Sequence, residues 1–152
     1  MKTPSPPPAV ALLGAGGAAQ AAANCTIKLD SNDRMQFDQK TVTVSAGCRS
    51  INIELHHSGA LPVTAMGHNV VVHPPPAAAP TAPGAAPKAG AAGNYLPAGD
   101  KRVLGSTKLI GGGQTTTATF PASALRAGGD YTFFCSFPGH SALMRGKLVV
   151  AP

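Results

Sequence analysis

The chain has 152 residues, of which 43% are hydrophobic, so it is long enough for one domain with a buried core and short for two. Its formal net charge of +6 invites a nucleic-acid ligand, but the lysines and arginines are scattered and only 5% of the residues are aromatic, which argues against a nucleic-acid-binding protein. No stretch approaches the roughly 18 uninterrupted apolar residues of a membrane-spanning helix, so we expect no membrane span in the mature protein.

The first 23 residues have the order of parts found in a secretory signal peptide. Lys2 provides a positive charge, residues 9–15 form a short apolar stretch, and small residues follow with Ala-x-Ala cleavage sites that end at Ala21 or Ala23. A disordered tail rich in proline and alanine is the alternative, because four of the first eight residues are proline. We predict a signal peptide over residues 1–23 and an exported mature domain over residues 24–152.

Short segments of alternating apolar and polar residues predict strands. The clearest is 50–56, which places Ile51, Ile53 and Leu55 on one face and polar residues on the other. Glycine, proline, asparagine and aspartate mark turns between such segments, and only residues 123–126 suggest a helical turn. The predicted strands are 25–29, 41–45, 50–56, 69–73, 108–110, 115–120, 131–135 and 147–151. These elements predict an all-β fold, an eight-stranded Greek-key β-sandwich.

Residues 74–93 form a low-complexity segment. Eighteen of these 20 residues are proline, alanine or glycine, and six of them are prolines, which remove backbone donors and prevent a helix from propagating. An interdomain linker is excluded by the need of one sandwich for strands from both sides of the segment. We therefore expect an exposed, partly extended flap.

The most informative chemistry lies directly after the predicted strand 131–135. Cys135, His140 and Met144 place a thiolate, an imidazole and a thioether on one short loop with the spacing Cys-x4-His-x3-Met. His68, in the sequence Met-Gly-His-Asn before an apolar run, provides a second imidazole. Two imidazoles and a thiolate with a weak axial thioether are the ligands of blue-copper electron-transfer sites. Zinc is the alternative metal, but a tetrahedral zinc site makes no use of a weak methionine ligand, so the pattern favours one copper ion.

These motifs closely resemble the azurin family of type 1 blue copper proteins, which have the cupredoxin fold. Residues 32–37, 59–62 and 107–111 also look like azurin, so the resemblance runs from Cys25 to Val150. It is interrupted at residues 74–93, where the family has a short helical flap, and at Val70, where it usually has a tryptophan.

The resemblance implies further roles around the metal. The backbone carbonyl of Gly67 would be a weak axial neighbour of the metal, opposite Met144. The backbone N–H groups of Asn69 and Phe137 would point at the Cys135 sulfur, and the Asn69 side chain would tie its segment to Ser136. Phe137 and Pro138 would screen the metal from water. With Cys135 taken by the metal, Cys25 and Cys48 are left to pair, and the resemblance implies the same disulfide.

The remaining histidines have simpler interpretations. His57 aligns with a histidine that responds to pH in some azurins, so it is either a tuning residue or a buried histidine with satisfied hydrogen bonds. His56 and His73 are expected at the surface.

In the azurin resemblance, the ring edge of His140 reaches the surface within an apolar patch that docks partner proteins. The patch comprises Met35, Leu61, Ala65, Met66, Phe137, Pro138, Gly139, Ala142 and Leu143. Lys40 is expected on a distant strand.

Taken together, the sequence predicts a periplasmic carrier of one electron, not an enzyme. Its partners would be redox proteins such as c-type cytochromes, reductases or oxidases. One alternative is a copper-binding protein that sequesters or delivers the metal. Another treats Cys135 and His140 as a nucleophile and base, although no orienting acid or oxyanion site accompanies them.

Overall fold

The computed structural model describes residues 23–74 and 90–152. The signal peptide predicted over residues 1–23 therefore lies almost wholly outside the described residues, as do residues 75–89 of the predicted flap. Among the described residues, no helix is both long and apolar enough to cross a membrane.

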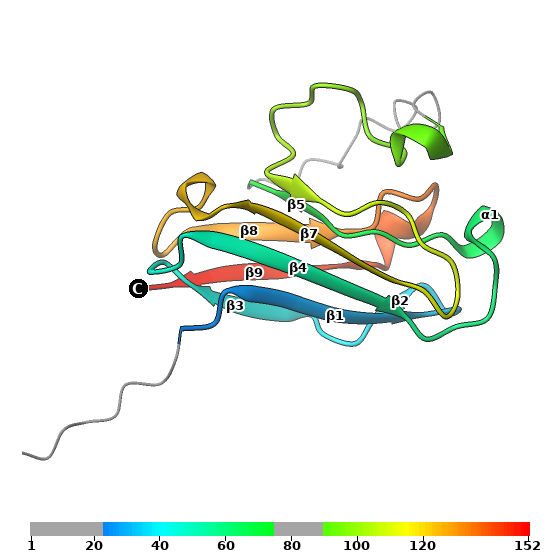
Figure 1. Ribbon diagram of the computed structural model, residues 1–152, viewed down its shortest axis with the longest axis horizontal. Helices are drawn as coiled ribbons and strands as arrows, with labels where there is room; N and C mark the ends of the chain where they lie inside the picture. Colours follow the sequence, from blue (N-terminus) through cyan, green and yellow to red (C-terminus); the bar gives the residue numbers. More distant parts are fainter. Residues whose placement is uncertain (1–22, 75–89) are drawn as a thin grey trace, which may run out of the picture.

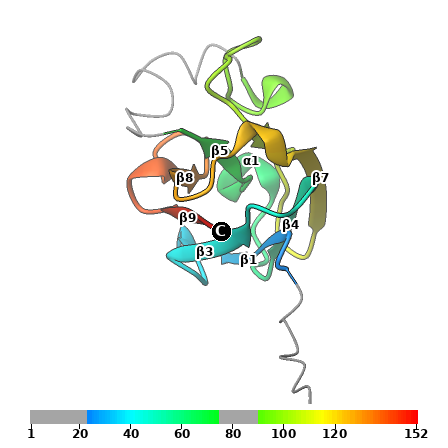
Figure 2. The same ribbon diagram turned by 90° about the vertical axis from the view of Figure 1, so that its left-hand side faces the viewer.

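Two mixed β-sheets pack face to face (Figure 1). The first has the order β2-β1-β4-β7 and the second the order β3-β9-β8-β5-β6. The end-on view shows β4 and β7 on one side of the sandwich and β8 and β9 on the other (Figure 2). The strands are β1 (Thr26–Asn32), β2 (Gln36–Phe37), β3 (Thr41–Ser45), β4 (Ser50–His57), β5 (Val71–His73), β6 (Gly105–Ser106), β7 (Thr115–Pro121), β8 (Asp130–Phe134) and β9 (Arg145–Ala151). The helical elements are α1 (Val63–Met66), η1 (Ala91–Gly93), η2 (Ala122–Ala124) and η3 (His140–Ala142).

The residues that alternate between apolar and polar along the sequence also alternate between buried and exposed in the sandwich. Along β4, Ile51, Ile53 and Leu55 are buried while Asn52 and His56 are exposed. The buried residues of both sheets form one apolar core that also contains Cys135 and Met144. The predicted cupredoxin-like β-sandwich is confirmed.

The observed strands differ from the predicted ones in two respects. The predicted strand 108–110 is wrong, because Ile110 makes only an isolated bridge to His68 and the ladder of β5 is instead closed by β6. The described residues contain nine strands rather than eight, since the two-residue strands β2 and β6 are too short to show a period-two pattern. The predicted helical turn is present as η2, one residue earlier than expected.

His73 corrects a second expectation. It was predicted at the surface, but it is only 3% exposed and its ring lies edge-on to Phe134. The reason is the position of β5, whose three residues are all buried between β8 and β6. His56 is exposed as expected and pairs with Asp30.

The predicted disulfide between Cys25 and Cys48 is present and joins the chain just before β1 to the chain just before β4. The described part of the chain has one free cysteine, the buried Cys135. The cysteines are therefore divided as the sequence predicted.

Candidate metal centre

Two connections at one end of the sandwich carry the candidate ligands, at the end opposite the C-terminus (Figure 1). His68 lies just before β5, where its backbone exchanges two hydrogen bonds with Ile110. Cys135 is the first residue after β8, and His140 opens η3 after Gly139, whose φ of 81° turns the chain. The pairing of β5 with β8 in the second sheet thus brings together segments that are 67 positions apart in the sequence.

The three predicted ligand side chains converge. The ligand atoms of His68, Cys135 and His140 all lie within 4.8 Å of one another, and this is the only such group among residues 23–74 and 90–152. The Cys135 Sγ lies 4.0 Å from His68 Nδ1 and 3.7 Å from His140 Nδ1. All three residues are buried. One thiol sulfur and two imidazole nitrogens therefore face one small volume.

Hydrogen bonding presents the correct nitrogen of His68 to that volume. Its Nε2–H donates to the backbone carbonyl of Asn32 at 2.8 Å, which leaves the Nδ1 lone pair facing Cys135. Burial lowers the pKa of His68, and burial together with the neighbouring His68 and His57 lowers the pKa of His140 to about 4. Both rings are thus neutral at physiological pH, as a metal ligand requires.

The environment of Cys135 fits a metal-bound thiolate. Burial raises the pKa of its thiol to about 11, while backbone N–H groups of Asn69 and Phe137 act in the opposite direction by donating to the sulfur. A buried thiolate with two amide donors still lacks a counter-charge, and a bound cation supplies one. The donor set therefore fits copper, and the N–H contacts predicted from the resemblance are found.

Gly67 and Met144 both contact residues of this group. The Gly67 carbonyl oxygen lies 3.8 Å from the Cys135 Sγ. Met144 is fully buried, its N–H donates to the carbonyl of His140, and its own carbonyl accepts the N–H of Cys135. The backbone thus closes the loop 135–144 on itself and keeps Met144 beside the ligand loop.

A buried polar link joins the two ligand segments. Asn69 Oδ1 accepts the backbone N–H of Ser136 at 2.9 Å, and Asn69 Nδ2 donates to Ser136 Oγ at 2.8 Å. The resemblance implied this pair of residues. Nothing in the sequence pointed to Asn94, whose backbone carbonyl accepts the Ser136 hydroxyl at 2.6 Å. Asn94 has a positive φ of 52°, which asparagine tolerates, but its position at the edge of the low-complexity segment hid it.

His57 packs directly against a predicted ligand. It is fully buried, and its ring stacks on the ring of His68 with a centroid distance of 4.3 Å. Its Nε2–H donates to the carbonyl of Met66 and its Nδ1 accepts the N–H of Gly59, so both ring nitrogens are satisfied. This geometry is that of a buried histidine whose two ring nitrogens both form hydrogen bonds.

Asp33 also was not anticipated. Its carboxylate accepts the N–H groups of Ala60 and Leu61 and lies 3.8 Å from His57 Nε2. The hydrogen bond from Ala60 lowers the pKa of Asp33, so the group is ionised at neutral pH. The 58–62 connection is therefore anchored to the turn that follows β1.

The predicted apolar patch lies around this end. Among the described residues, the exposed large hydrophobic side chains are Leu61, Val63 and Leu143, all in the connections that surround the ligands. Leu143 is the most exposed, at 55%. Val63 was not predicted as a member. Of the predicted members, Ala65, Pro138, Gly139 and Ala142 are exposed, and Met35, Met66 and Phe137 are partly buried.

Lys40 contradicts the expectation that it lies far from the patch. Its Nζ donates to the backbone carbonyl of Leu143 at 3.2 Å. The connection between β2 and β3 brings it there, because β3 pairs with β9, which starts directly after the ligand loop. Lys40 is therefore a neighbour of the patch.

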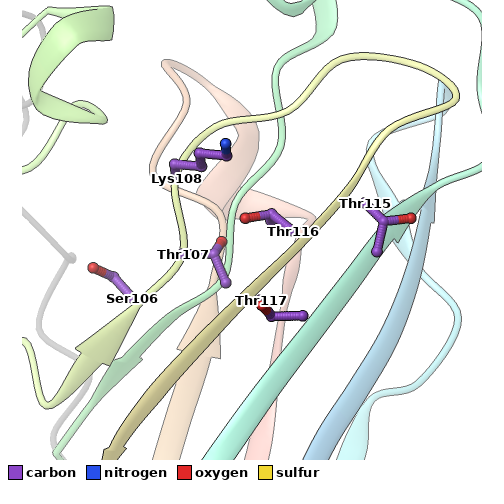
Figure 3. A pocket seen from close by; sticks show the side chains of 6 residues that line it. All are labelled: Ser106, Thr107, Lys108, Thr115, Thr116 and Thr117. Atoms are coloured by element: carbon purple, nitrogen blue, oxygen red, sulfur yellow. The ribbon is translucent and has the colours of Figure 1, made fainter.

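A separate hollow of about 410 Å³ lies between β6 and β7 (Figure 3). Its lining consists of hydroxyl groups and one amine, from Ser106, Thr107, Lys108, Thr115, Thr116 and Thr117. It contains none of the predicted ligands, so it is distinct from the candidate metal centre.

Comparisons with known proteins agree with this geometry. Residues 23–151 match the family described as copper binding proteins, plastocyanin/azurin family. Azurin of Bordetella pertussis is 46% identical over 140 residues, which are 91% of this chain and 92% of that protein. Azurin of Alcaligenes faecalis is 45% identical over 124 residues, covering 82% and 96% of the two chains. The solved structure of azurin Az-iso2 from Methylomonas sp. strain J is similar with a TM-score of 0.78 and 38% identity, covering 86% of this chain and all of that one.

Proposed function

This chain belongs to the plastocyanin/azurin family of copper binding proteins, and from that premise we propose that it is a periplasmic carrier that passes single electrons between redox proteins. The observation that supports this most is the convergence of one thiol and two imidazoles, all three buried, on one small volume. Copper bound there would take up and release one electron by alternating between Cu(II) and Cu(I).

The proposed ligands follow from the donor atoms. His68 Nδ1, Cys135 Sγ and His140 Nδ1 would form the equatorial set, because these three atoms face one another. Met144 would be the weak axial ligand, and the Gly67 carbonyl would be the more distant axial neighbour on the other side. Asn69, Ser136 and Phe137 would fix the thiolate through the hydrogen bonds described above.

The frame around the ligands suits electron transfer because it restrains their movement. Hydrogen bonds hold the His68 ring to Asn32 and the Asn69 side chain to Ser136, and a backbone bond closes the loop from Cys135 to Met144. A donor set held in this way changes little when the oxidation state changes. Little reorganisation favours fast exchange of electrons.

Export to the periplasm is supported by two independent features of the chain. The first is the signal-like order of residues 1–23. The second is the disulfide between Cys25 and Cys48, since disulfides persist in oxidising compartments. The partners we propose are c-type cytochromes and redox enzymes such as reductases or oxidases of the same compartment.

An electron carrier, rather than an enzyme with a nucleophilic cysteine, fits the state of Cys135. Its Sγ lies 3.7 Å from His140, but the side chain is fully buried and burial raises the thiol pKa to about 11. A nucleophilic cysteine needs the opposite, a lowered pKa and access for a substrate. Iodoacetamide should therefore modify Cys135 slowly in the metal-free protein, and not at all when copper holds its sulfur.

The proposed exit for electrons is His140, under the apolar patch. A charge at the centre of this patch, Met66→Lys or Ala142→Lys, should leave the colour and the reduction potential nearly unchanged. It should slow electron self-exchange about tenfold or more, because two like charges meet in every encounter.

Arg126→Glu is the control for a change of charge far from the patch, since Arg126 lies in the connection before β8, whereas Cys135 follows that strand. It should change self-exchange little. Patch variants that exchange electrons as fast as the parent protein would rule out an exit through His140.

Copper storage or delivery is separated from electron transfer by comparing two rates. A carrier should exchange electrons with a redox reagent many times before it loses copper to a chelator such as bicinchoninate. A storage or delivery protein should release copper at least as fast as it is oxidised and reduced. The second result would contradict the proposal.

A further inference from the structure

Three exposed cations adjoin residues of the apolar patch, two of them where the ligand loop meets β9. Lys40 and Arg145 flank Leu143, whose carbonyl oxygen accepts both the Lys40 ammonium at 3.2 Å and the Arg145 backbone N–H at 3.1 Å. Arg34 precedes Met35 in the turn after β1, two residues after Asn32, whose carbonyl at the end of β1 accepts the hydrogen bond of His68. We call these three residues the basic rim.

No carboxylate forms an ion pair with the basic rim. All six acidic residues of the chain lie in the described ranges, and none forms an ion pair with Arg34, Lys40 or Arg145. Three of them pair with other residues instead, with His56, Arg102 and Lys147. Two carboxylates lie close to the rim in sequence, and both accept backbone N–H groups: Asp33, next to Arg34, accepts those of Ala60 and Leu61, and Asp38, two residues before Lys40, accepts that of Asp30.

The position of these cations matters more than the net charge. Leu143 is the most exposed large hydrophobic residue among those described, so the rim lies beside the part of the patch that protrudes. A partner that covers Leu143 brings its own surface next to Lys40 and Arg145. Charges at the edge of a contact affect the rate of encounter and the choice of partner more than the affinity.

We propose that this face selects redox partners whose contact surface combines an apolar centre with carboxylates beside it, facing the basic rim. The inference rests on the proposed function and adds the charge of the partner. Apolar contact alone would accept any flat partner, whereas the rim attracts acidic surfaces and repels basic ones.

The test compares two one-electron oxidants of opposite charge. Each takes one electron from the Cu(I) protein, which leaves Cu(II), and is itself reduced by one electron. Hexacyanoferrate(III) carries three negative charges, and tris(1,10-phenanthroline)cobalt(III) carries three positive charges. At low ionic strength, Lys40→Glu and Arg145→Glu should each slow the reaction with hexacyanoferrate(III) about tenfold and speed the reaction with the cobalt complex. High salt should remove both effects.

Arg126→Glu is again the matched control, because it changes the net charge by the same amount at the other end of β8. It should alter both rates by less than about twofold. Equal effects of Lys40→Glu and Arg126→Glu would show that only net charge matters and would overturn the proposal. Lys40→Met, which keeps most of the aliphatic stem, should show about half of the logarithmic effect of Lys40→Glu.

Binding can be followed separately from electron transfer. Hexacyanocobaltate(III) has the charge of hexacyanoferrate(III) but is redox-inert, so it can be titrated into the Cu(I) protein. The backbone amide signals of Leu143 and Arg145 should shift in the parent protein and in Arg126→Glu, and should shift at least fivefold less in Lys40→Glu. Uniform shifts over the surface would overturn the proposal. A parent protein that binds copper but reacts with neither oxidant would instead contradict the proposed function, and the inference with it.

Discussion

Replacing Asn69 should lower the free energy of unfolding more than the small size of this side chain suggests, because the side chain is the polar link between the two ligand segments. Asn69→Leu keeps a side chain of similar volume but removes both hydrogen bonds to Ser136. The Ser136 hydroxyl keeps its bond to the Asn94 carbonyl. The Ser136 backbone N–H, in contrast, loses its acceptor while it remains buried.

The size of the effect follows from these contacts. Two lost hydrogen bonds contribute about 1 kcal/mol each, and a buried N–H without an acceptor adds about 1–3 kcal/mol. Together these amount to about 3–5 kcal/mol, and the apolar contacts of the new leucine offset part of this loss, so we expect the free energy of unfolding to fall by about 2–4 kcal/mol. For a domain of this size, that corresponds to a Tm lower by roughly 10 °C.

Thermal and urea denaturation followed by circular dichroism would measure this loss in the metal-free protein. Asn52→Leu is the matched control, since Asn52 is exposed on β4 and accepts one hydrogen bond from Thr119. Its cost should stay below about 1 kcal/mol. If Asn69→Leu were as stable as Asn52→Leu, the link between the ligand segments would not contribute to stability.

Three further predictions concern the disulfide, the axial ligand and pH. The double variant Cys25→Ala, Cys48→Ala should lower the free energy of unfolding by about 2–5 kcal/mol, because the disulfide closes a loop with a sequence separation of 23. An unchanged free energy of unfolding in urea denaturation would contradict this prediction. Met144→Leu should keep the blue colour and change the reduction potential, measured by redox titration, because an axial thioether tunes the metal; loss of copper would refute the axial assignment. In the metal-free protein, burial lowers the pKa of His68, and burial together with the neighbouring histidines lowers the pKa of His140 to about 4. Below about pH 6.5 the unfolded chain therefore binds protons that the folded protein does not bind. Its free energy of unfolding, measured in urea, should be nearly constant between about pH 7 and pH 8, below the range in which the Cys135 thiol of the unfolded chain ionises, and should fall by about 1–3 kcal/mol from pH 7 towards pH 4. A rise between pH 7 and pH 4 would contradict the account.

The ligand loop could be predicted because its three candidate ligands lie close together in the sequence. Cys135, His140 and Met144 share one short stretch, and their spacing alone indicates which chemistry they support. His68 required a second motif and a sandwich that brings it to the same end. Alternation of apolar and polar residues was sufficient for that fold, since most strands bury one face.

Residues that act through distant contacts could not be predicted in the same way. Lys40 meets Leu143 across 103 positions of sequence, and only the pairing of β3 with β9 explains the contact. His73 looked like a surface residue before a run of prolines, but β5 is buried on both sides. Asn94 enters the site through its backbone carbonyl, which any residue type possesses.

The central claim is that Cys135 donates a thiolate to copper together with two histidines and a weak methionine, and one measurement tests it most directly. Cu(II) should be added to the purified, metal-free protein and to its Cys135→Ser variant, and the visible absorption recorded. We predict an intense blue colour from thiolate-to-copper charge transfer in the parent protein and none in the variant. A parent protein that binds Cu(II) with only a pale colour, or a variant that turns as blue as the parent, would contradict the account.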